Sequence, residues 1–167
     1  MSIRFVEREG GPAIVLTDDA LSAIDKYRQI DMKAKESGGQ MFAKFEGADT
    51  IIVEATIPKI LDKRSRYGFK PNKMLQRLEI YDRYRKGLHF IGDWHTHPEK
   101  HPSPSDKDIS NMAECFHLSI HNLRAFVMVL VGTEPVSGGL YVALVKGEAI
   151  VHLIKETNPC LLMDGLR

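Results

Sequence analysis

One short run near the middle of the chain strongly limits how the backbone around it can fold. Residues 95–108 follow the pattern His-x-His-x7-Ser-x-x-Asp. The residues just before it, 88–94 (LHFIGDW), have the aromatic and aliphatic content of a buried strand. Three prolines follow the histidines and exclude a helix from the next stretch. The run therefore predicts a strand, a rigid loop that turns back, and then a new element.

That new element reads as a helix start. Ser105 and Asp108 form a Ser-x-x-Asp pattern that resembles a capping box. Residues three apart lie on one face of a helix, so these two side chains stay together. Strand side chains alternate between faces, which puts His95 and His97 on one face and Thr96 on the other. The strand end and the helix start can therefore converge on one point.

The residue types at this point indicate a metal. Two imidazoles and one carboxylate are the ligand set of a catalytic zinc, which takes three protein ligands and keeps a fourth position for water. We therefore predict that His95, His97 and Asp108 bind one zinc ion, with Ser105 beside the open position. Ligand type biases the choice of metal without fixing it, so iron and manganese stay open. Such a site points to hydrolysis.

Water activated by zinc, with a pKa of about 7, needs a carboxylate to take its proton and pass it on. Glu36 is the best candidate, because Gly38 and Gly39 behind it let the backbone pass close to another element. Asp93 falls on the same strand face as His95 and could instead orient an imidazole. The other carboxylates that could serve as the base are Glu54, Asp93, Glu99 and Asp106.

Over about residues 13–145 these motifs resemble a known family. The segments Glu36-Ser-Gly-Gly, His95-Thr-His97-Pro and Pro104-Ser105-x-x-Asp108 are similar to the signature of the JAMM zinc metalloproteases, also called JAB or MPN. The resemblance implies an α/β (α+β) fold of the JAB/MPN, cytidine-deaminase-like type, with a mixed, curved β-sheet flanked by helices. It also implies zinc ligands at His95, His97 and Asp108, Glu36 as general acid/base, and Ser105 as hydrogen-bond donor to the developing oxyanion.

Members of that family cleave isopeptide or peptide bonds after the C-terminal glycine of ubiquitin or ubiquitin-like proteins. Residues 92–99 (GDWHTHPE) and 102–105 (PSPS) resemble the bacterial branch, in particular the JAMM isopeptidase of CD-NTase-associated (CBASS) antiphage operons. This implies a protein substrate with a flexible C-terminal tail, a CD-NTase or ubiquitin-like conjugate. Two alternatives stay open: a JAMM peptidase of another bacterial ubiquitin-like or sulfur-carrier system, and a non-catalytic MPN scaffold.

Composition agrees with a cytoplasmic enzyme. A chain of 167 residues predicts one domain over 1–167, and a net charge of +1 carries no nucleic-acid signature. The N-terminus (MSIRFVEREGG) lacks the apolar run of a signal peptide, and no apolar stretch is long enough to span a membrane. Cys115 and Cys160 are too few for a disulfide framework, and we expect Cys115 to pack as a small hydrophobic residue. Nothing in the sequence predicts an oligomeric state.

Hydrophobic periodicity predicts the remaining elements. The second helix takes its pattern from Met74, Leu75, Leu78 and Tyr81, whereas the 61–71 segment is polar and irregular. Its basic residues Lys63, Arg64, Arg66 and Lys70 are typical of a solvated face, and they are also our candidates for contact with a substrate tail. We expect His101 to be an exposed loop residue, with contact to the substrate as the open alternative, and structural or solvent roles for His117, His121 and His152. Strands are predicted at 3–7, 13–16, 41–45, 50–57, 125–131 and 140–146, and helices at 18–34, 72–86 and 105–116.

Overall fold

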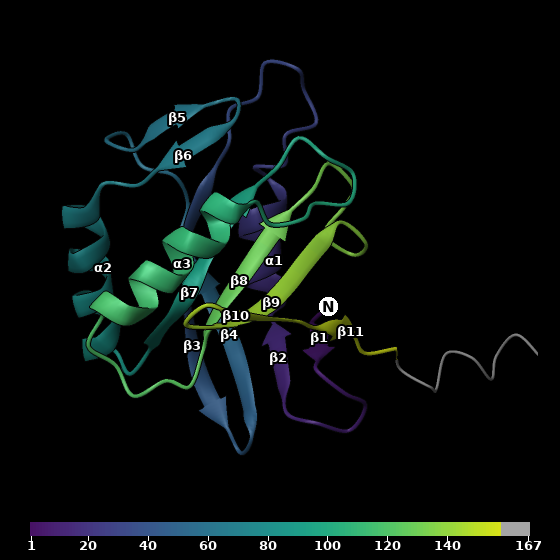
Figure 1. The fold of residues 1–167 in the computed structure, drawn as a ribbon, viewed down its shortest axis with the longest axis vertical. Helices are drawn as coiled ribbons and strands as arrows, with labels where there is room; N and C mark the ends of the chain where they lie inside the picture. Colours follow the sequence, from purple (N-terminus) through teal and green to yellow (C-terminus); the bar gives the residue numbers. More distant parts are fainter. Residues whose placement is uncertain (158–167) are drawn as a thin grey trace, which may run out of the picture.

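The computed structural model describes residues 1–157, which form one nine-stranded mixed sheet, a separate two-stranded hairpin and three helices (Figure 1). The sheet runs in the order β10-β9-β8-β7-β3-β4-β2-β1-β11, and β5 pairs with β6. Cys160, for which the sequence predicts no disulfide, lies outside the described residues. In chain order the elements are β1 (Ile3–Val6), β2 (Ala13–Leu16), α1 (Asp18–Asp25), β3 (Gly38–Glu46), β4 (Asp49–Ala55), β5 (Lys63–Ser65), β6 (Gly68–Lys70), α2 (Lys73–Arg85), β7 (His89–Thr96), α3 (Asp106–Leu118), β8 (Phe126–Val131), β9 (Leu140–Lys146), β10 (Ala149–His152) and β11 (Ile154–Lys155).

The centre of the sheet places the metal motif. Strand β7 pairs antiparallel with β3 and parallel with β8, so both of its edges are hydrogen-bonded. A second parallel pair joins β2 to β4, and the other neighbours are antiparallel. The mixed, curved sheet flanked by helices that the resemblance implies is therefore confirmed.

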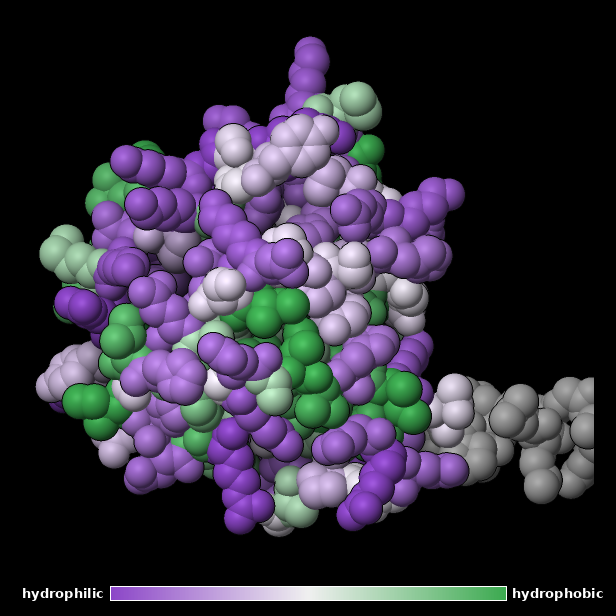
Figure 2. Space-filling model, viewed as in Figure 1, coloured by the Kyte–Doolittle hydropathy of each residue, from purple (hydrophilic) through white to green (hydrophobic). Residues whose placement is uncertain are grey.

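Helices cover both faces of the sheet (Figure 1). On one face, Leu21 and Ile24 of α1 pack into a large core with Trp94 and Val129. On the other face, Met112 of α3 packs on a smaller cluster that includes residues of β8. Figure 2 shows a mostly hydrophilic exterior with a hydrophobic area below its centre. Among residues 1–157, no helix is long and apolar enough to cross a membrane.

The helix predicted at 18–34 is too long. Helix α1 ends at Asp25 with Lys26 as its C-cap, and Ile30, an apolar residue within the predicted helix, is 70% exposed. Gln29 is instead buried and uses its side-chain amide to bond other segments. The buried hydrogen bonds of Gln29 therefore outweigh the helical periodicity of the sequence, and the helix ends before residue 29.

Three other sequence expectations need correction. The 61–71 segment, expected to be irregular, contains the hairpin β5–β6. Strand β3 begins at Gly38, three residues earlier than predicted, because Gly38 and Gly39 pair with the end of β7. The short strands β10 and β11 were not predicted at all. The helix predicted at 72–86 is confirmed within one residue at each end, with Asn72 as its N-cap.

Candidate metal centre and active site

The end of β7, the residue after it and the first turn of α3 bring three potential metal ligands, two imidazoles and one carboxylate, to one point. Nε2 of His95 lies 3.1 Å from Nε2 of His97 and 3.1 Å from Oδ1 of Asp108. Nε2 of His97 lies 3.5 Å from Oδ2 of Asp108. One donor atom from each residue falls within 4.8 Å of the others. The strand and the helix therefore converge as the sequence predicts.

These separations suit a single tetrahedral ion. Donor atoms that each lie about 2.0 Å from one zinc ion are roughly 3.3 Å apart when the angles between them are tetrahedral. The two histidine nitrogens lie 3.1 Å apart, and each lies 3.1 to 3.5 Å from an Asp108 oxygen, Oδ1 for His95 and Oδ2 for His97. The donor set is also the one that zinc accepts in hydrolytic sites, so the residues present fit the metal that the resemblance implies.

The charges around the three side chains favour a cation. Burial alone would raise the pKa of Asp108, but hydrogen bonds from His95, His97 and Ser105 hold it well below its usual range. Burial lowers the pKa of His97, yet the hydrogen bond to Asp108 and the nearby charge of Glu36 outweigh it and leave that pKa raised. The carboxylate is thus ionised and draws positive charge toward itself.

Ser105 holds Asp108 in place as the N-cap of α3. Its hydroxyl accepts a hydrogen bond from the Asp108 amide at 3.1 Å and donates to Oδ2 of Asp108 at 2.7 Å. Its own amide donates to the same Oδ2 at 2.8 Å. The predicted capping box is therefore present, and the exposed Ser105 hydroxyl stands directly beside the proposed ligand.

Glu36 lies at the same site although it is 59 residues upstream of His95. Its half-buried carboxyl is close enough to His95, His97 and Asp108 for their charges to act on its pKa. Burial raises that pKa above its ordinary value, while the two histidines oppose the shift. Of the carboxylates considered from sequence, Glu36 is the one whose pKa responds to the charges of His95, His97 and Asp108 together.

The glycines behind Glu36 make its position possible. A Cβ atom on Gly39 would lie 2.0 Å from the Thr56 carbonyl oxygen, and one on Gly38 would lie 2.7 Å from the Phe69 ring. Real Cβ atoms do not approach other atoms this closely, so only glycine fits at either position. The predicted close approach of the backbone to another element is confirmed.

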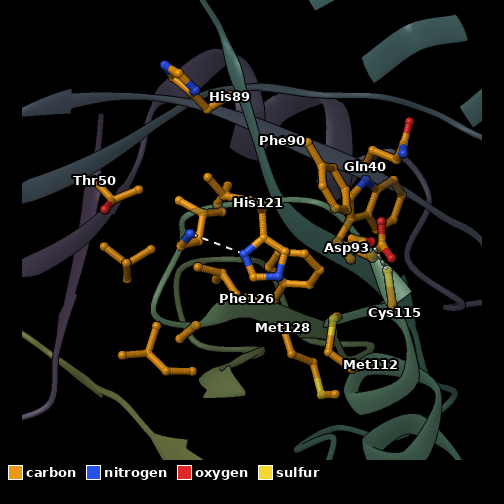
Figure 3. A pocket seen from close by; sticks show the side chains of 18 of the residues that line it. Gln40, Thr50, His89, Phe90, Asp93, Met112, Cys115, His121, Phe126 and Met128 are labelled. Carbon is orange, nitrogen blue, oxygen red and sulfur yellow. Dashed lines mark hydrogen bonds between the residues drawn. The ribbon is translucent and has the colours of Figure 1, made fainter. Parts of the chain in front are cut away.

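The rival carboxylates have other surroundings. Glu54 pairs with Arg83 at 2.6 Å, and Glu99 and Asp106 are exposed. Asp93 lies near Gln40 and Cys115 in a pocket (Figure 3), and burial raises its pKa to about 7. Its Oδ1 is buried and has no hydrogen-bond partner among residues 1–157, so that atom does not orient an imidazole.

The other singled-out residues behave as expected from sequence. Cys115 packs beside the Met112 cluster and is not part of the His-His-Asp group. His121 makes a 2.9 Å hydrogen bond with the Phe116 carbonyl and accepts one from the Leu123 amide at 3.1 Å, a structural role. His101 is exposed.

Three residues near the site were missed or read differently from the sequence. Thr96 faces away from the ligand side, as alternation predicts, but its hydroxyl bonds Ser37 and Gln29, for which no role was expected. Arg64, read as a solvated or tail-binding residue, donates to the Glu36 carbonyl at 2.9 Å. Arg66 donates to the carbonyls of residues 31 and 32. The alternation of side chains along a strand predicted which face of the sheet Thr96 occupies. No local sequence pattern predicted its hydrogen-bond partners.

Comparison with known proteins agrees with the fold and with the family that the sequence resembles. A family model described as prokaryotic homologs of the JAB domain matches residues 22–140. A solution structure of a protein from Desulfitobacterium hafniense is similar with a TM-score of 0.56 and 18% identity, covering 82% of this chain and 87% of that one. That likeness supports the fold alone.

Curated relatives share more of the sequence. The chain is 33% identical over 134 residues to a Pseudomonas aeruginosa protein, with 75% of this chain and 80% of that protein covered. It is 27% identical over 159 residues to one from Enterobacter hormaechei, covering 92% and 88%, and 29% identical over 125 residues to one from Escherichia coli, covering 73% and 71%. All three relatives are named CD-NTase/cGAS isopeptidase. The family model spans most of the chain, which therefore belongs to the prokaryotic homologs of the JAB domain.

Proposed function

We propose that this chain is a zinc-dependent isopeptidase of the JAMM type. It hydrolyses the bond after the C-terminus of a CD-NTase or ubiquitin-like protein and so reverses the conjugation of that protein in bacterial antiviral (CBASS) signalling. The single observation that carries the proposal is the convergence of His95, His97 and Asp108, with one donor atom from each within 4.8 Å of the others, beside the half-buried Glu36. The names of the curated relatives support the substrate class.

In this proposal His95, His97 and Asp108 hold the zinc ion. When bound, zinc polarises the scissile carbonyl and lowers the pKa of water to about 7. Glu36 takes a proton from the attacking water at its carboxylate and delivers it to the nitrogen of the leaving amine. The raised pKa of Glu36 suits this relay, because a base works best when its pKa approaches the working pH.

Ser105 has a second task in the proposed reaction. Its hydroxyl, now directed at Asp108, turns toward the substrate and donates to the carbonyl oxygen as that atom becomes negative. A hydroxyl hydrogen rotates freely enough for this change of partner. The backbone amide of Ser105 keeps its bond to Asp108 meanwhile, so the ligand stays oriented.

The substrate tail needs a path to this site. The exposed Lys63 and Lys70 of the β5–β6 hairpin are our candidates for contact with it, whereas Arg64 and Arg66 have intramolecular partners. The cytoplasmic location inferred from composition stays a prediction.

The test uses a CD-NTase fused at its C-terminus to a reporter protein, incubated with and without a chelator. We expect cleavage at the junction, loss of cleavage on chelation, and recovery when zinc is added back. Glu36→Gln should keep its zinc and lose turnover, whereas His97→Ala should lose the metal, because only two protein ligands remain. Cleavage that survives chelation, or a fully active Glu36→Gln, would contradict the proposal.

Two further outcomes separate the alternatives. Stoichiometric zinc with no hydrolysis of any fusion favours a scaffold. Cleavage of a ubiquitin-like or sulfur-carrier fusion, with the CD-NTase fusion left intact, favours a peptidase of another bacterial system.

A further inference from the structure

We propose that Thr96 and Arg64 are positioning residues that together fix the backbone of Glu36 relative to the metal strand. The inference rests on the proposed role of Glu36 as the base. It adds that the base is held from two sides, by a buried hydroxyl between the two histidine ligands and by a guanidinium on the β5–β6 hairpin.

Thr96 forms the first support. It lies between His95 and His97 in the chain and is fully buried. Its amide donates to the Ser37 carbonyl at 2.8 Å, and its Oγ1 accepts from the Ser37 amide at 2.9 Å. Both backbone polar groups of the residue after Glu36 are therefore bonded to the residue between the two histidines.

Gln29 fixes the direction of the Thr96 hydroxyl. Its Nε2 donates to the Arg66 carbonyl at 2.9 Å and to the Ala34 carbonyl at 3.3 Å. Its Oε1 is thus left to accept, and the Thr96 hydroxyl donates to it at 2.8 Å. With its hydrogen committed to Gln29, Oγ1 presents a lone pair to the Ser37 amide. Gln29 is only 2% exposed, so water cannot replace these bonds.

Arg64 forms the second support. Its Nε donates to the Glu36 carbonyl at 2.9 Å, and a terminal nitrogen bonds the Ser37 hydroxyl. The Glu36 amide donates to the carbonyl of Ser65, the next residue of the hairpin, at 2.7 Å. All four backbone polar groups of residues 36 and 37 are therefore bonded, and only side-chain rotation can move the carboxylate.

If these contacts position Glu36, their loss should affect the catalytic rate rather than the binding of the substrate. A displacement of about 1 Å in a catalytic group can cost on the order of 100-fold in rate. Loss of either support should therefore lower kcat and leave KM unchanged, because neither group faces the substrate in this proposal. A substrate contact by Arg64 would do the opposite and raise KM.

The experiment compares Thr96→Val, Thr96→Ser and Arg64→Ala with the wild-type enzyme on the CD-NTase reporter fusion. Arg8→Ala, an exposed arginine in the β1–β2 loop, is the matched control. Each variant is measured for kcat, KM and zinc content. Hydrogen–deuterium exchange of a peptide covering residues 35–39 gives a readout that needs no activity.

We expect Thr96→Val to lower kcat by on the order of 100-fold with KM and zinc content unchanged, and to speed exchange of the Ser37 amide. Thr96→Ser keeps the hydroxyl and should behave like the wild type. The Arg64 side chain is half-exposed, so Arg64→Ala tests the positioning role even if Thr96→Val folds poorly. It should lower kcat and speed exchange in the same peptide, whereas Arg8→Ala should do neither.

A kcat unchanged in both Thr96→Val and Arg64→Ala, with Glu36→Gln inactive, overturns the positioning role and leaves the proposed function intact. A raised KM with normal kcat in Arg64→Ala overturns it for Arg64 alone. If Glu36→Gln is fully active, the proposed function itself fails. The variants of Thr96 and Arg64 test only the positioning role and do not decide that question.

Discussion

Glycine is required at two positions where the strands beside the site meet their neighbours. At Gly39 a Cβ atom would sit 2.0 Å from the Thr56 carbonyl oxygen. At Gly92, in β7, it would sit 1.9 Å from the Val127 carbonyl oxygen, and the backbone has a φ of 147°. Both contacts are with backbone atoms, which cannot rotate away as a side chain can.

We therefore expect Gly39→Ala and Gly92→Ala each to lower the free energy of unfolding by roughly 3 kcal/mol or more. Gly138→Ala is the control, because a Cβ atom there meets nothing within 4 Å. Urea unfolding followed by the fluorescence of Trp94, the one tryptophan of the chain, measures the change. A Gly39→Ala variant as stable as Gly138→Ala would contradict the close approach.

For single residues, the sequence predicts the proposed metal ligands better than it predicts the residues that hold the site in place. His95, His97, Ser105 and Asp108 fall within fourteen consecutive residues, so the alternation of a strand and the pitch of a helix suffice to bring them together. Its glycines made Glu36 the best of several candidate bases, and the resemblance to a family then gave it the role of general acid/base. Thr96 and Gln29 bond across 67 residues, and no local pattern encodes that contact.

Among the elements, α2 differs most from what its pattern suggests. Its boundaries are predicted well, yet it has no buried residue, and Met74, Leu78 and Tyr81 of its apolar pattern are each more than half exposed. Two ion pairs tie it to the rest, Lys59 with Glu79 at 2.7 Å and Arg83 with Glu54 at 2.6 Å. Periodicity located the helix but could not tell which side meets the sheet.

A helix held by partly exposed ion pairs should open easily. We expect the amides of α2 to exchange with deuterium at least about tenfold faster than those of β8, in which every residue is buried, and faster still at high salt, which screens the pairs. Hydrogen exchange with mass spectrometry resolves the two segments. Equal protection of α2 and β8 at both salt concentrations would show that α2 is part of the most stable unit.

At the scale of the whole molecule, the strand order was the least predictable property. The composition of the buried central strands predicts them from sequence. In contrast, β10 and β11 are short, and their extended conformation depends on pairing with β9 and β1. The pairing of β11 with β1 joins segments about 150 residues apart. Such contacts depend on the assembled sheet rather than on the local sequence.

The same non-local assembly links metal binding to the stability of the whole chain. The three donor residues come from the end of β7 and from α3, on either side of a proline-rich loop, and they converge only in the folded protein. A metal that binds the folded state alone stabilises it by mass action, by about 2.7 kcal/mol when free zinc is 100 times its Kd. For a chain of this size that is a rise in Tm of roughly 5–10 °C.

Thermal unfolding with added zinc and with chelator should show this difference in the wild type and in Glu36→Gln, which keeps all three donors. His97→Ala should show little of it, because its two remaining donors bind the metal weakly. A wild-type Tm that does not respond to zinc, or a His97→Ala variant that responds fully, would mean that this cluster is not where the metal binds.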